Sequence, residues 1–252
     1  MASGRPGKIR LDRLLVERGL VESREQAQGL ILAGQILVDE QKKEKCGALV
    51  DAQAALRLLG EARKYVSRGG LKLAGALEHF RLNPDTKVCF DIGASTGGFT
   101  DCLLQHGAGK VFAVDVGSNQ LDWKLRRDTR VVVLEKTNAR YLTFDRIGTL
   151  AELVTVDVSF ISVTLILPAL VPLLASPADL IVLVKPQFEV GKGQVGKGGI
   201  VRHPAQHQEA VARVSRKLLE LGFSKLASME SPLLGAEGNR EFFLHAVWKK
   251  SG

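Results

Sequence analysis

The sequence predicts an α/β protein, in which helices cover both faces of a mostly parallel sheet and a small α+β module precedes it. Two observations predict this fold. From residue 86 onward, short apolar runs alternate with helical patterns, and strands separated by helices of that length form right-handed βαβ units. Before residue 63, the chain shows two short amphipathic helical patterns followed by a β-like run. A length of 252 residues has room for one large domain and a small appendage.

The front module begins with two predicted helices. Residues 11–18 carry leucines at helical spacing, and a glycine follows them as a C-terminal cap. Ser23 and Gln26 form the S-x-x-Q capping box of a second helix, which we expect to stop at Gly34. Residues 36–39 then predict a strand.

Basic residues are concentrated in this part of the chain. Residues 1–75 hold 14 Lys and Arg against 9 Asp and Glu, within a chain whose net charge is +8. Such an excess is typical of a module that binds a polyanion, and a solvated basic face is the alternative. With 45% hydrophobic and 25% charged residues, the chain is too apolar for a disordered protein.

Three segments of the front module resemble the S4 RNA-binding domain. They are Arg10-Leu-Asp-Arg-Leu-Leu, Ser23-Arg-Glu-Gln-Ala and Ala33-Gly-Gln-Ile-Leu-Val-Asp, and the resemblance covers residues 8 to about 62. It implies a helix pair that presents cations to an RNA backbone, which supplies affinity without sequence readout. The candidate RNA-binding residues are Lys8, Arg10, Arg13, Arg18, Arg24, Lys42 and, beyond the module, Arg68.

We expect the domain boundary near residue 63. Residues 61–70 depart from helical periodicity and contain a glycine pair. The predicted organisation is therefore an RNA-binding domain over residues 1–62, a linker and entry helix over residues 63–85, and a second domain over residues 86–252.

Seven short apolar runs predict the strands of the second domain. These runs are Lys87–Ile92, Val111–Val114, Val131–Leu134, Leu153–Val156, Leu180–Val184, Leu226–Ser228 and Phe242–Val247. Because only a loop rich in proline and glycine separates the last two, they favour a terminal antiparallel hairpin. His203-Pro204 predicts the start of a helix that runs to Leu221.

The apolar stretch over residues 163–184 is long enough to raise the question of a membrane span. Three prolines and Asp179 interrupt it, so we predict a buried helix, a turn at Ser176-Pro177 and a short strand instead.

The N-terminus lacks the apolar segment of a secretory signal, and the three cysteines show no C-x-x-C spacing. We expect a reducing, cytoplasmic location and no membrane partner.

A glycine-rich loop follows the first strand of the second domain. It reads Asp91-Ile-Gly-Ala-Ser-Thr-Gly-Gly-Phe-Thr, at the sheet edge where doubly wound folds bind cofactors. A dinucleotide fingerprint needs glycine where Ser95 stands, and the G-K-[ST] of a Walker loop is missing. Both absences disfavour NAD and ATP, and a strand-to-helix turn without a ligand is the alternative.

Asp115 ends the second strand, 24 residues after Asp91, where a carboxylate can accept hydrogen bonds from ribose hydroxyls. The loop together with this acid resembles the S-adenosylmethionine site of class I methyltransferases. The resemblance implies a seven-stranded sheet with an antiparallel last strand and S-adenosylmethionine as the cofactor. The candidate cofactor-binding residues are Asp91, Gly93, Ser95, Thr96, Gly97, Gly98, Phe99, Asp115, Val116 and Asn138, the last of which could reach the adenine.

The chemistry that a methyltransferase performs depends on its acceptor. Methylation of cytosine carbon-5 needs a cysteine nucleophile, and none of the three cysteines follows a proline in a loop after a strand. Methylation of a base nitrogen favours [DN]-P-P-[YF] after the fourth strand, where Asp157-Val-Ser-Phe160 is a degenerate match. A ribose hydroxyl is a weak acid and needs a base, which a lysine can be.

Lys185 ends the fifth strand and Asp157 the fourth, while Lys72 and Glu241 lie at the entry to the domain and before its last strand. The position of Lys185 points into the cofactor cleft of this fold, whereas each of the other three charges alone is typical of a protein surface. Their order resembles the K-D-K-E tetrad of FtsJ-type ribose methyltransferases, which implies that all four are catalytic. We expect Lys185, with its ammonium form disfavoured by Lys72 and a buried cleft, to take the 2'-hydroxyl proton while the two acids orient the lysines.

Longer strings closely resemble the TlyA family, in which an S4 domain precedes an FtsJ-like methyltransferase domain. They are Val66-Ser-Arg-Gly-Gly-Leu-Lys-Leu, the glycine-rich loop, Asp157-Val-Ser-Phe-Ile-Ser, Val184-Lys-Pro-Gln-Phe-Glu-Val-Gly and Asn239-Arg-Glu-Phe-Phe. The family implies 2'-O-methylation of cytidine in ribosomal RNA of one or both subunits, and some members carry a haemolysin label. Residues 61–64 lack the tryptophan-containing tetrapeptide of some members, so interdomain coupling described for those members need not transfer.

Two alternatives to this enzyme stay open: a non-catalytic ribosome-assembly factor that binds RNA, and a membrane-active haemolysin.

Residues 191–199 hold five glycines and two lysines, which favours either a mobile lid or a plain connector. The five histidines lack the spacing of metal ligands, and we expect no catalytic metal.

Overall fold

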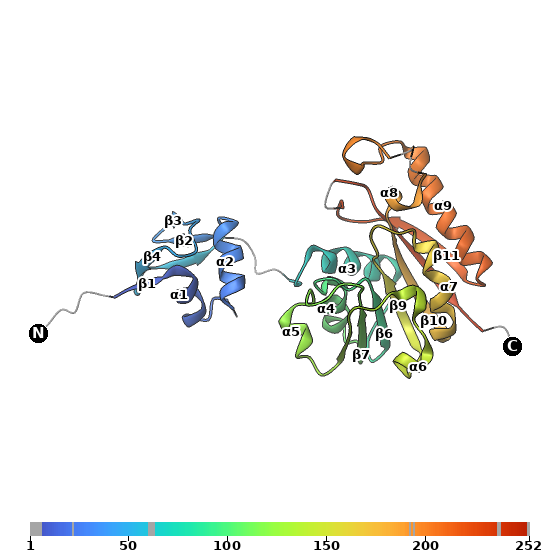
Figure 1. Ribbon diagram of the computed structural model, residues 1–252, viewed down its shortest axis with the longest axis horizontal. Coiled ribbons are helices and arrows are strands. Elements are labelled where there is room, and N and C mark those ends of the chain that lie inside the picture. Colours follow the sequence, from blue (N-terminus) through green and yellow to red (C-terminus); the bar gives the residue numbers. More distant parts are fainter. Residues whose placement is uncertain are drawn as a thin grey trace, which may run out of the picture. The chain divides into compact units, whose positions relative to one another are not determined.

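The computed structural model describes residues 7–21, 23–59, 64–191, 193, 195–235 and 238–250. The chain forms two compact units, Met1–Arg63 and Lys64–Gly252 (Figure 1). The residues around this division, 60–63, lie outside the described part, as do Lys192 and Gln194 of the glycine-rich segment.

The first unit is a pair of helices packed on short antiparallel strands. Its elements are β1 Lys8–Arg10, α1 Leu11–Glu17, α2 Arg24–Leu32, β2 Ile36–Val38, β3 Gln41–Lys42, β4 Leu49–Asp51 and β5 Leu56–Leu58. Strands β3, β2 and β5 form one sheet, and β1 pairs with β4. Both predicted helices and the strand β2 are confirmed, and Ser23 Oγ caps α2 by accepting the Gln26 N–H at 3.2 Å. Leu15 and Ile31 join the two helices in a fully buried core.

The second unit is built on a seven-stranded sheet in the order β11-β12-β10-β9-β6-β7-β8. Its strands are β6 Val88–Ile92, β7 Lys110–Val114, β8 Val131–Leu134, β9 Ala151–Val156, β10 Leu174–Val184, β11 Ser224–Glu230 and β12 Phe242–Trp248. Strands β8, β7, β6, β9 and β10 are parallel, while β12 runs antiparallel to β10 and β11. The predicted mostly parallel sheet with a terminal antiparallel hairpin is confirmed.

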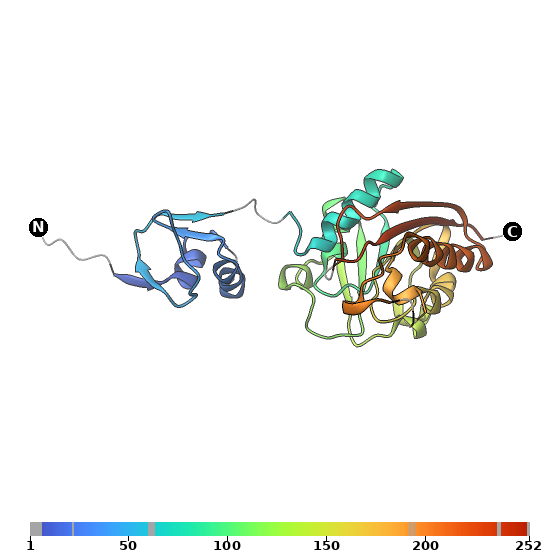
Figure 2. The same cartoon turned by 90° about the horizontal axis from the view of Figure 1, so that it is seen from above.

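Helices cover both faces of this sheet, as Figures 1 and 2 show. The helical segments are α3 Arg68–Phe80, α4 Gly98–Gln105, α5 Trp123–Arg126, η1 Ala139–Tyr141, α6 Phe144–Ile147, η2 Val163–Leu165, α7 Leu167–Leu170, η3 Val171–Leu173, α8 Pro186–Glu189, η5 Lys197–Gly199 and α9 Pro204–Glu220. Helices α3, α4 and α5 share one apolar core with one face, and α7 and α9 share another with the opposite face. Adjacent residues of β10 alternate between the two, Ile181 facing the first core and Val182 the second. Burial on both faces explains why the strands are continuously apolar in sequence.

The strand order reverses beside β6, which positions the site. The chain continues from β6 to β7 and β8 on one side, and then crosses to β9 and β10 on the other. Doubly wound sheets bind ligands at the carboxyl ends of the strands next to such a reversal. The residues at these ends are Gly93 after β6, Asp115 after β7, Asp157 after β9 and Lys185 after β10.

The apolar stretch over residues 163–184 differs in part from the prediction. Short helical turns occupy its first half, as expected, but β10 begins at Leu174, so Ser176-Pro177 lies within a strand and forms no turn. A shift of pairing register between Leu174 and Asp179 accommodates the proline, which cannot donate to the ladder. None of the helices in the described residues is both long and apolar enough to cross a membrane.

Candidate active site

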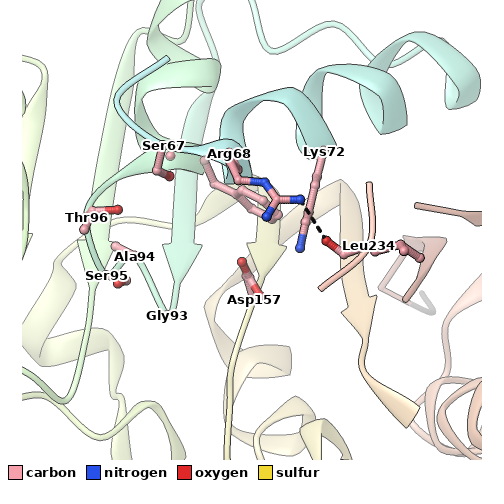
Figure 3. Close-up of a pocket in the computed structure, with 12 residues that line it drawn as sticks. Ser67, Arg68, Lys72, Gly93, Ala94, Ser95, Thr96, Asp157 and Leu234 are labelled. Atoms are coloured by element: carbon pink, nitrogen blue, oxygen red, sulfur yellow. Dashed lines mark hydrogen bonds between the residues drawn. The ribbon is translucent and has the colours of Figure 1, made fainter. Parts of the chain in front are cut away.

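A cavity of about 190 Å³ lies at the carboxyl edge of the sheet in the second unit (Figure 3). The turn between β6 and α4, the start of α3, the residue after β9 and the loop before β12 surround it. Its lining residues are Ser67, Arg68, Gly69, Lys72, Gly93, Ala94, Ser95, Thr96, Gly98, Phe99, Asp157 and Leu234. It therefore brings together predicted cofactor residues and predicted catalytic residues.

Glycines of the loop after β6 are required by close approaches of the backbone. Gly93 has a φ of +88°, and a Cβ there would lie 2.3 Å from the carbonyl oxygen of Asp157. A Cβ on Gly98 would lie 2.2 Å from Ser67 Oγ and 3.0 Å from a backbone nitrogen. The loop is thus held against both β9 and α3, and the N-terminus of α4 follows it, where backbone N–H groups can bind an anion.

Asp115 joins the end of β7 to the same loop. Its Oδ2 accepts the Ser95 N–H at 2.8 Å, and its Oδ1 accepts the Gly117 N–H at 2.7 Å. The carboxylate is partly exposed, so each oxygen keeps a lone pair for a ribose hydroxyl. The Asp115 carboxylate fits the ribose of S-adenosylmethionine. The glycine-rich loop beside it, which a Cβ would block, fits the amino-acid end of that cofactor.

Asp91, one of the predicted cofactor residues, does not line the cavity. Its side chain is fully buried, and it accepts hydrogen bonds from Thr100 Oγ1 at 2.7 Å and Thr155 Oγ1 at 3.3 Å. Burial raises the pKa of this carboxyl to about 7. Asp91 therefore fixes α4 to strands β6 and β9 from behind the loop.

Four other predicted cofactor residues are outside the cavity lining as well: Asp115, described above, and Gly97, Val116 and Asn138. Gly97 forms the N-cap of α4 in the left-handed region, at a φ of +96°. Val116 projects into solvent with 70% of its surface exposed. Asn138 caps η1 by accepting the Arg140 N–H at 3.1 Å. The sequence pattern located their loops correctly, but it could not show which side chains face inward.

The four predicted catalytic residues form two ion pairs. Lys72 Nζ lies 2.6 Å from Glu241 Oε2, and Lys185 Nζ lies 2.6 Å from Asp157 Oδ1. The lysine side chains are only 12% and 10% exposed. In Figure 3, Lys72 from α3 and Asp157 after β9 extend toward the same space. The structure therefore pairs each lysine with one acid, as the expected orienting role of the acids requires.

Sequence reasoning missed Ser159, a second partner of Lys185. Ser159 Oγ accepts a hydrogen bond from Lys185 Nζ at 2.8 Å. In sequence, Asp157-Val-Ser-Phe160 is only a degenerate match to a base-methylation motif, yet its serine lies two residues after the acid and contacts the same lysine. Ser67 and Gly69 were also missed, because the turn before α3 gave no signal of packing against the glycine-rich loop.

The predicted RNA-binding residues of the first unit are largely engaged within it. Arg10 and Arg24 donate to the same oxygen, Asp12 Oδ2, at 2.8 and 2.9 Å. Asp12 is fully buried, and the Arg10 guanidinium beside it holds the pKa of its carboxyl well below the usual range. The remaining pairs are Arg13 with Glu17, Arg18 with the Ala52 and Ala54 carbonyls, and Lys42 with Glu44.

Although these side chains are paired within the unit, the guanidiniums stay accessible. Arg10 and Arg24 are 49% and 54% exposed, and an arginine has five N–H donors, so each keeps donors for a phosphate. Lys8 is exposed at the start of β1. Arg68 belongs to the second unit, where it lines the cavity and donates to the Leu234 carbonyl at 3.3 Å.

Within the described residues, no group of three His, Cys, Asp or Glu side chains could hold a metal ion.

Comparison with known proteins gives two family matches. Residues 65–248 match the FtsJ-like methyltransferase model, and residues 9–53 match the S4 domain model. Together the matched segments cover most of the chain in the order that the sequence predicted.

Curated relatives align over nearly their full length. The chain is 50% identical to the 16S/23S rRNA (cytidine-2'-O)-methyltransferase TlyA of Mycobacterium tuberculosis over 238 residues, 94% of this chain and 89% of the relative. It is 40% identical to Hemolysin A of Brachyspira hyodysenteriae, over 95% of this chain and the whole of that protein. A solved structure from Streptococcus thermophilus, described as a proposed hemolysin, superposes with a TM-score of 0.75 at 45% identity, over 98% of this chain and 90% of that one.

Proposed function

The chain belongs to the TlyA family of FtsJ-like methyltransferases, and from that premise we propose that it transfers a methyl group from S-adenosylmethionine to the 2'-hydroxyl of cytidine in ribosomal RNA. The observation that carries the proposal is the pair of partly buried lysine–acid contacts beside the glycine-rich loop. A cofactor site alone suits any methyl acceptor, whereas a lysine held at that site supplies the base that a ribose hydroxyl needs.

The residues that would hold S-adenosylmethionine are those of the loop after β6 and the acid after β7. Backbone N–H groups at the start of α4 suit the cofactor's carboxylate, and Asp115 suits its ribose hydroxyls. The bound cofactor supplies an electrophilic methyl group on a sulfonium. Gly93 and Gly98 keep the backbone open to it, because neither position has room for a side chain.

Lys185 takes the proton of the 2'-hydroxyl in this proposal. Its Nζ forms an ion pair with Asp157, 2.6 Å from Oδ1, and donates a hydrogen bond to Ser159 Oγ at 2.8 Å. A neutral amine has two N–H donors and one lone pair, so one donor can keep the bond to Ser159 while the lone pair accepts the hydroxyl proton. The protonated amine that results is stabilised by the same Asp157 carboxylate.

Lys72 places a second positive charge at the cavity. Its ammonium is held by Glu241, which is 4% exposed and approaches it from the residue before β12. A fixed cation stabilises negative charge that develops on the ribose oxygen as its proton leaves. Glu241 thus acts by orienting Lys72 rather than by touching the substrate.

The first unit supplies affinity for RNA. We propose that residues 1–62 are the RNA-binding domain, that Lys8, Arg10, Arg13, Arg18, Arg24 and Lys42 contact phosphates, and that Arg68 does so beside the cavity. Residues 63–85 then form the linker and entry helix, ahead of the methyltransferase domain over residues 86–252. Ribosomal RNA as substrate implies work in the cytoplasm.

The test is transfer of labelled methyl from S-adenosylmethionine to naked ribosomal RNA and to isolated subunits, followed by digestion to nucleosides. We expect label in 2'-O-methylcytidine. Label on a base would show that the methyl acceptor is a base nitrogen and would contradict the proposal. Absence of transfer to any RNA by protein that binds the cofactor in a calorimetric titration would favour the assembly-factor alternative.

A further inference from the structure

Glu189 is a buried acid that joins two segments of the candidate active site. It ends α8, which begins directly after Lys185, and it is 3% exposed. Its Oε2 accepts a hydrogen bond from Ser162 Oγ at 2.6 Å, and its Oε1 accepts the Val163 N–H at 2.8 Å. An acid buried this deeply needs such donors, because burial without them is strongly unfavourable.

The two segments leave the sheet from neighbouring parallel strands. Residues 157–163 follow β9, and residues 185–189 follow β10. Among the described residues, the side-chain hydrogen bonds between these segments come from Lys185 at one end and from Glu189 at the other. The bonds of Glu189 therefore hold together the two segments that carry the contact between Lys185 and Ser159.

Ser159 belongs to a stretch of chain that the sheet does not fix. The backbone N–H of Asp157 donates to the last carbonyl of β6 at 2.8 Å, so the sheet still holds that residue. Residues 158–161 make no backbone hydrogen bond to any described residue. The next fixed point is Ser162, where Glu189 and the start of η2 hold the chain. The distance from Ser159 to the lysine therefore depends on both fixed points.

Glu189 is itself held firmly on the other side. Within α8, the Phe188 N–H donates to the Lys185 carbonyl at 2.9 Å. Arg213 of α9 donates to the Glu189 carbonyl at 3.0 Å, and α8 packs against α9 (Figure 1). These contacts connect Glu189 to the lysine and to a long helix, so its carboxylate can keep the segment after β9 in place.

We infer that Glu189 is a positioning residue for the proton acceptor: by holding the segment after β9 to α8, it keeps Ser159 Oγ at hydrogen-bond distance from Lys185 Nζ. The inference rests on the proposed function, since it takes Lys185 to be the base. Glu189 does not line the cofactor cavity, so it acts through Ser159 and not by contact with the cofactor. Support of this kind sets how precisely a catalytic group is placed.

The first test compares Glu189→Ala, which removes the bridge, with Glu189→Gln, which can preserve it. A glutamine oxygen can accept the Val163 N–H, and its amide group can donate to Ser162 Oγ. In methyl transfer to ribosomal RNA, kcat should fall about tenfold in Glu189→Ala, with KM for both substrates near wild type. Glu189→Gln should restore kcat to near that of wild type. A loss in Glu189→Gln equal to that in Glu189→Ala would overturn the inference.

A double-mutant cycle tests whether Glu189 acts through Ser159. Ser159→Ala alone should lower kcat about tenfold, because Lys185 loses one hydrogen bond. Adding Glu189→Ala to that variant should lower kcat by less than about twofold more, since the contact that Glu189 maintains is already gone. If the two losses multiplied, Glu189 would act independently of Ser159 and the inference would be wrong.

Asp179→Ala is the matched control. Asp179 is also a largely buried acid that joins β10 to its surroundings, 3.2 Å from Lys87 Nζ and 2.9 Å from His245 Nε2, but it lies within the strand, away from the carboxyl end. Its kcat should equal that of wild type, and a tenfold loss would contradict a specific role for Glu189.

Folding of each variant is checked by calorimetric titration with S-adenosylmethionine. If Glu189→Ala does not bind the cofactor, Ser162→Ala takes its place, because it removes only one of the two bonds to Glu189. Its kcat should fall about threefold, in keeping with the partial loss of the bridge. An unchanged kcat in Ser162→Ala would then overturn the inference.

Acylation of the Lys185 amine, followed by mass spectrometry of the full-length protein's peptides, gives a readout that needs no methyl transfer. Its rate should rise about tenfold in Glu189→Ala, because the amine loses its bond to Ser159, and stay unchanged in Asp179→Ala. Equal rates in Glu189→Ala and wild type would overturn the inference. Failure of the proposed function gives a different result, in which wild type methylates no RNA while the difference in acylation persists.

Discussion

Lys185 Nζ lies 2.6 Å from Asp157 Oδ1, and each residue directly follows one of two neighbouring parallel strands, β10 and β9. The sheet itself therefore sets their separation, because hydrogen bonds along both strands fix where the two chains leave it. A base placed on rigid strands keeps its geometry without help from a mobile loop.

Replacing Lys185 with alanine should remove methyl transfer, with a loss of about 10²–10⁴-fold in kcat. Cofactor affinity should stay near that of wild type, because Lys185 does not line the cofactor cavity. Single-turnover transfer and calorimetric titration with S-adenosylmethionine measure the two effects. Lys217→Ala is the control, since its ion pair with Glu220 lies on the surface of α9. Near wild-type turnover in Lys185→Ala would show that another group is the base.

Replacing Gly98 with valine should have the opposite effect and weaken cofactor binding first. Its Cβ would lie 2.2 Å from Ser67 Oγ and close to backbone atoms of Gly69 and Gly70, so the loop must shift. We expect at least a tenfold rise in the dissociation constant for S-adenosylmethionine in a calorimetric titration. Gly29→Ala provides the contrast, because a Cβ on Gly29 meets nothing within 4 Å. Unchanged affinity in Gly98→Val would mean that the cofactor binds away from this loop.

The buried Asp91 should make stability depend on pH in a defined window. Its pKa is raised from 3.8 to about 7, so between these values the folded protein keeps a proton that the unfolded chain has lost. Stability from this group therefore falls as pH rises from about 4 to 7 and is constant above. The asparagine in Asp91→Asn cannot titrate. The free energy of unfolding of this variant minus that of wild type should therefore increase as pH rises from about 4 to 7. Urea unfolding at a series of pH values measures the difference, and a flat difference would contradict the assignment. Asp145→Asn, at an exposed carboxylate, should leave the difference flat.

Removing the Asp12 carboxylate should destabilise the first unit and disorder its two arginines. Asp12→Ala takes away the acceptor shared by Arg10 and Arg24, at an expected cost of about 1–3 kcal/mol in the free energy of unfolding. Because the pKa of Asp12 is lowered, its contribution is present at neutral pH and is lost as pH falls below about 4. Glu17→Ala breaks only an exposed pair with Arg13 and should change stability by less than about 0.5 kcal/mol. Equal stabilities for the two variants in denaturant titrations would refute the role of Asp12.

The sequence predicted those features that depend on local spacing. The loop at Gly93, the strand ends carrying Asp157 and Lys185, and the Ser23 cap all follow from patterns within a few residues. Features that depend on distant contacts escaped prediction. Nothing near Asp91 in the sequence shows that Thr155 closes over it.

The ion pairs of the front module also depend on residues that are distant in sequence. Arg24 lies 12 positions from Asp12, and only the packing of α1 on α2 brings them together. The excess of positive residues therefore located the module correctly, but it did not show how many of these side chains are paired within the module. The two-residue strand β3 was missed because so short a run carries no periodicity.

The close approach of Gly93 to the carbonyl oxygen of Asp157 links two parts of the site that are otherwise separate in sequence. A mutation that widens the cofactor loop must also displace the end of β9, where Asp157 pairs with the proposed base Lys185. Divergence within this architecture is therefore constrained, because a descendant cannot acquire a different cofactor loop and inherit the same proton acceptor unaltered. Changes of RNA target are free of that constraint when they arise in the first unit, which folds around a core of its own.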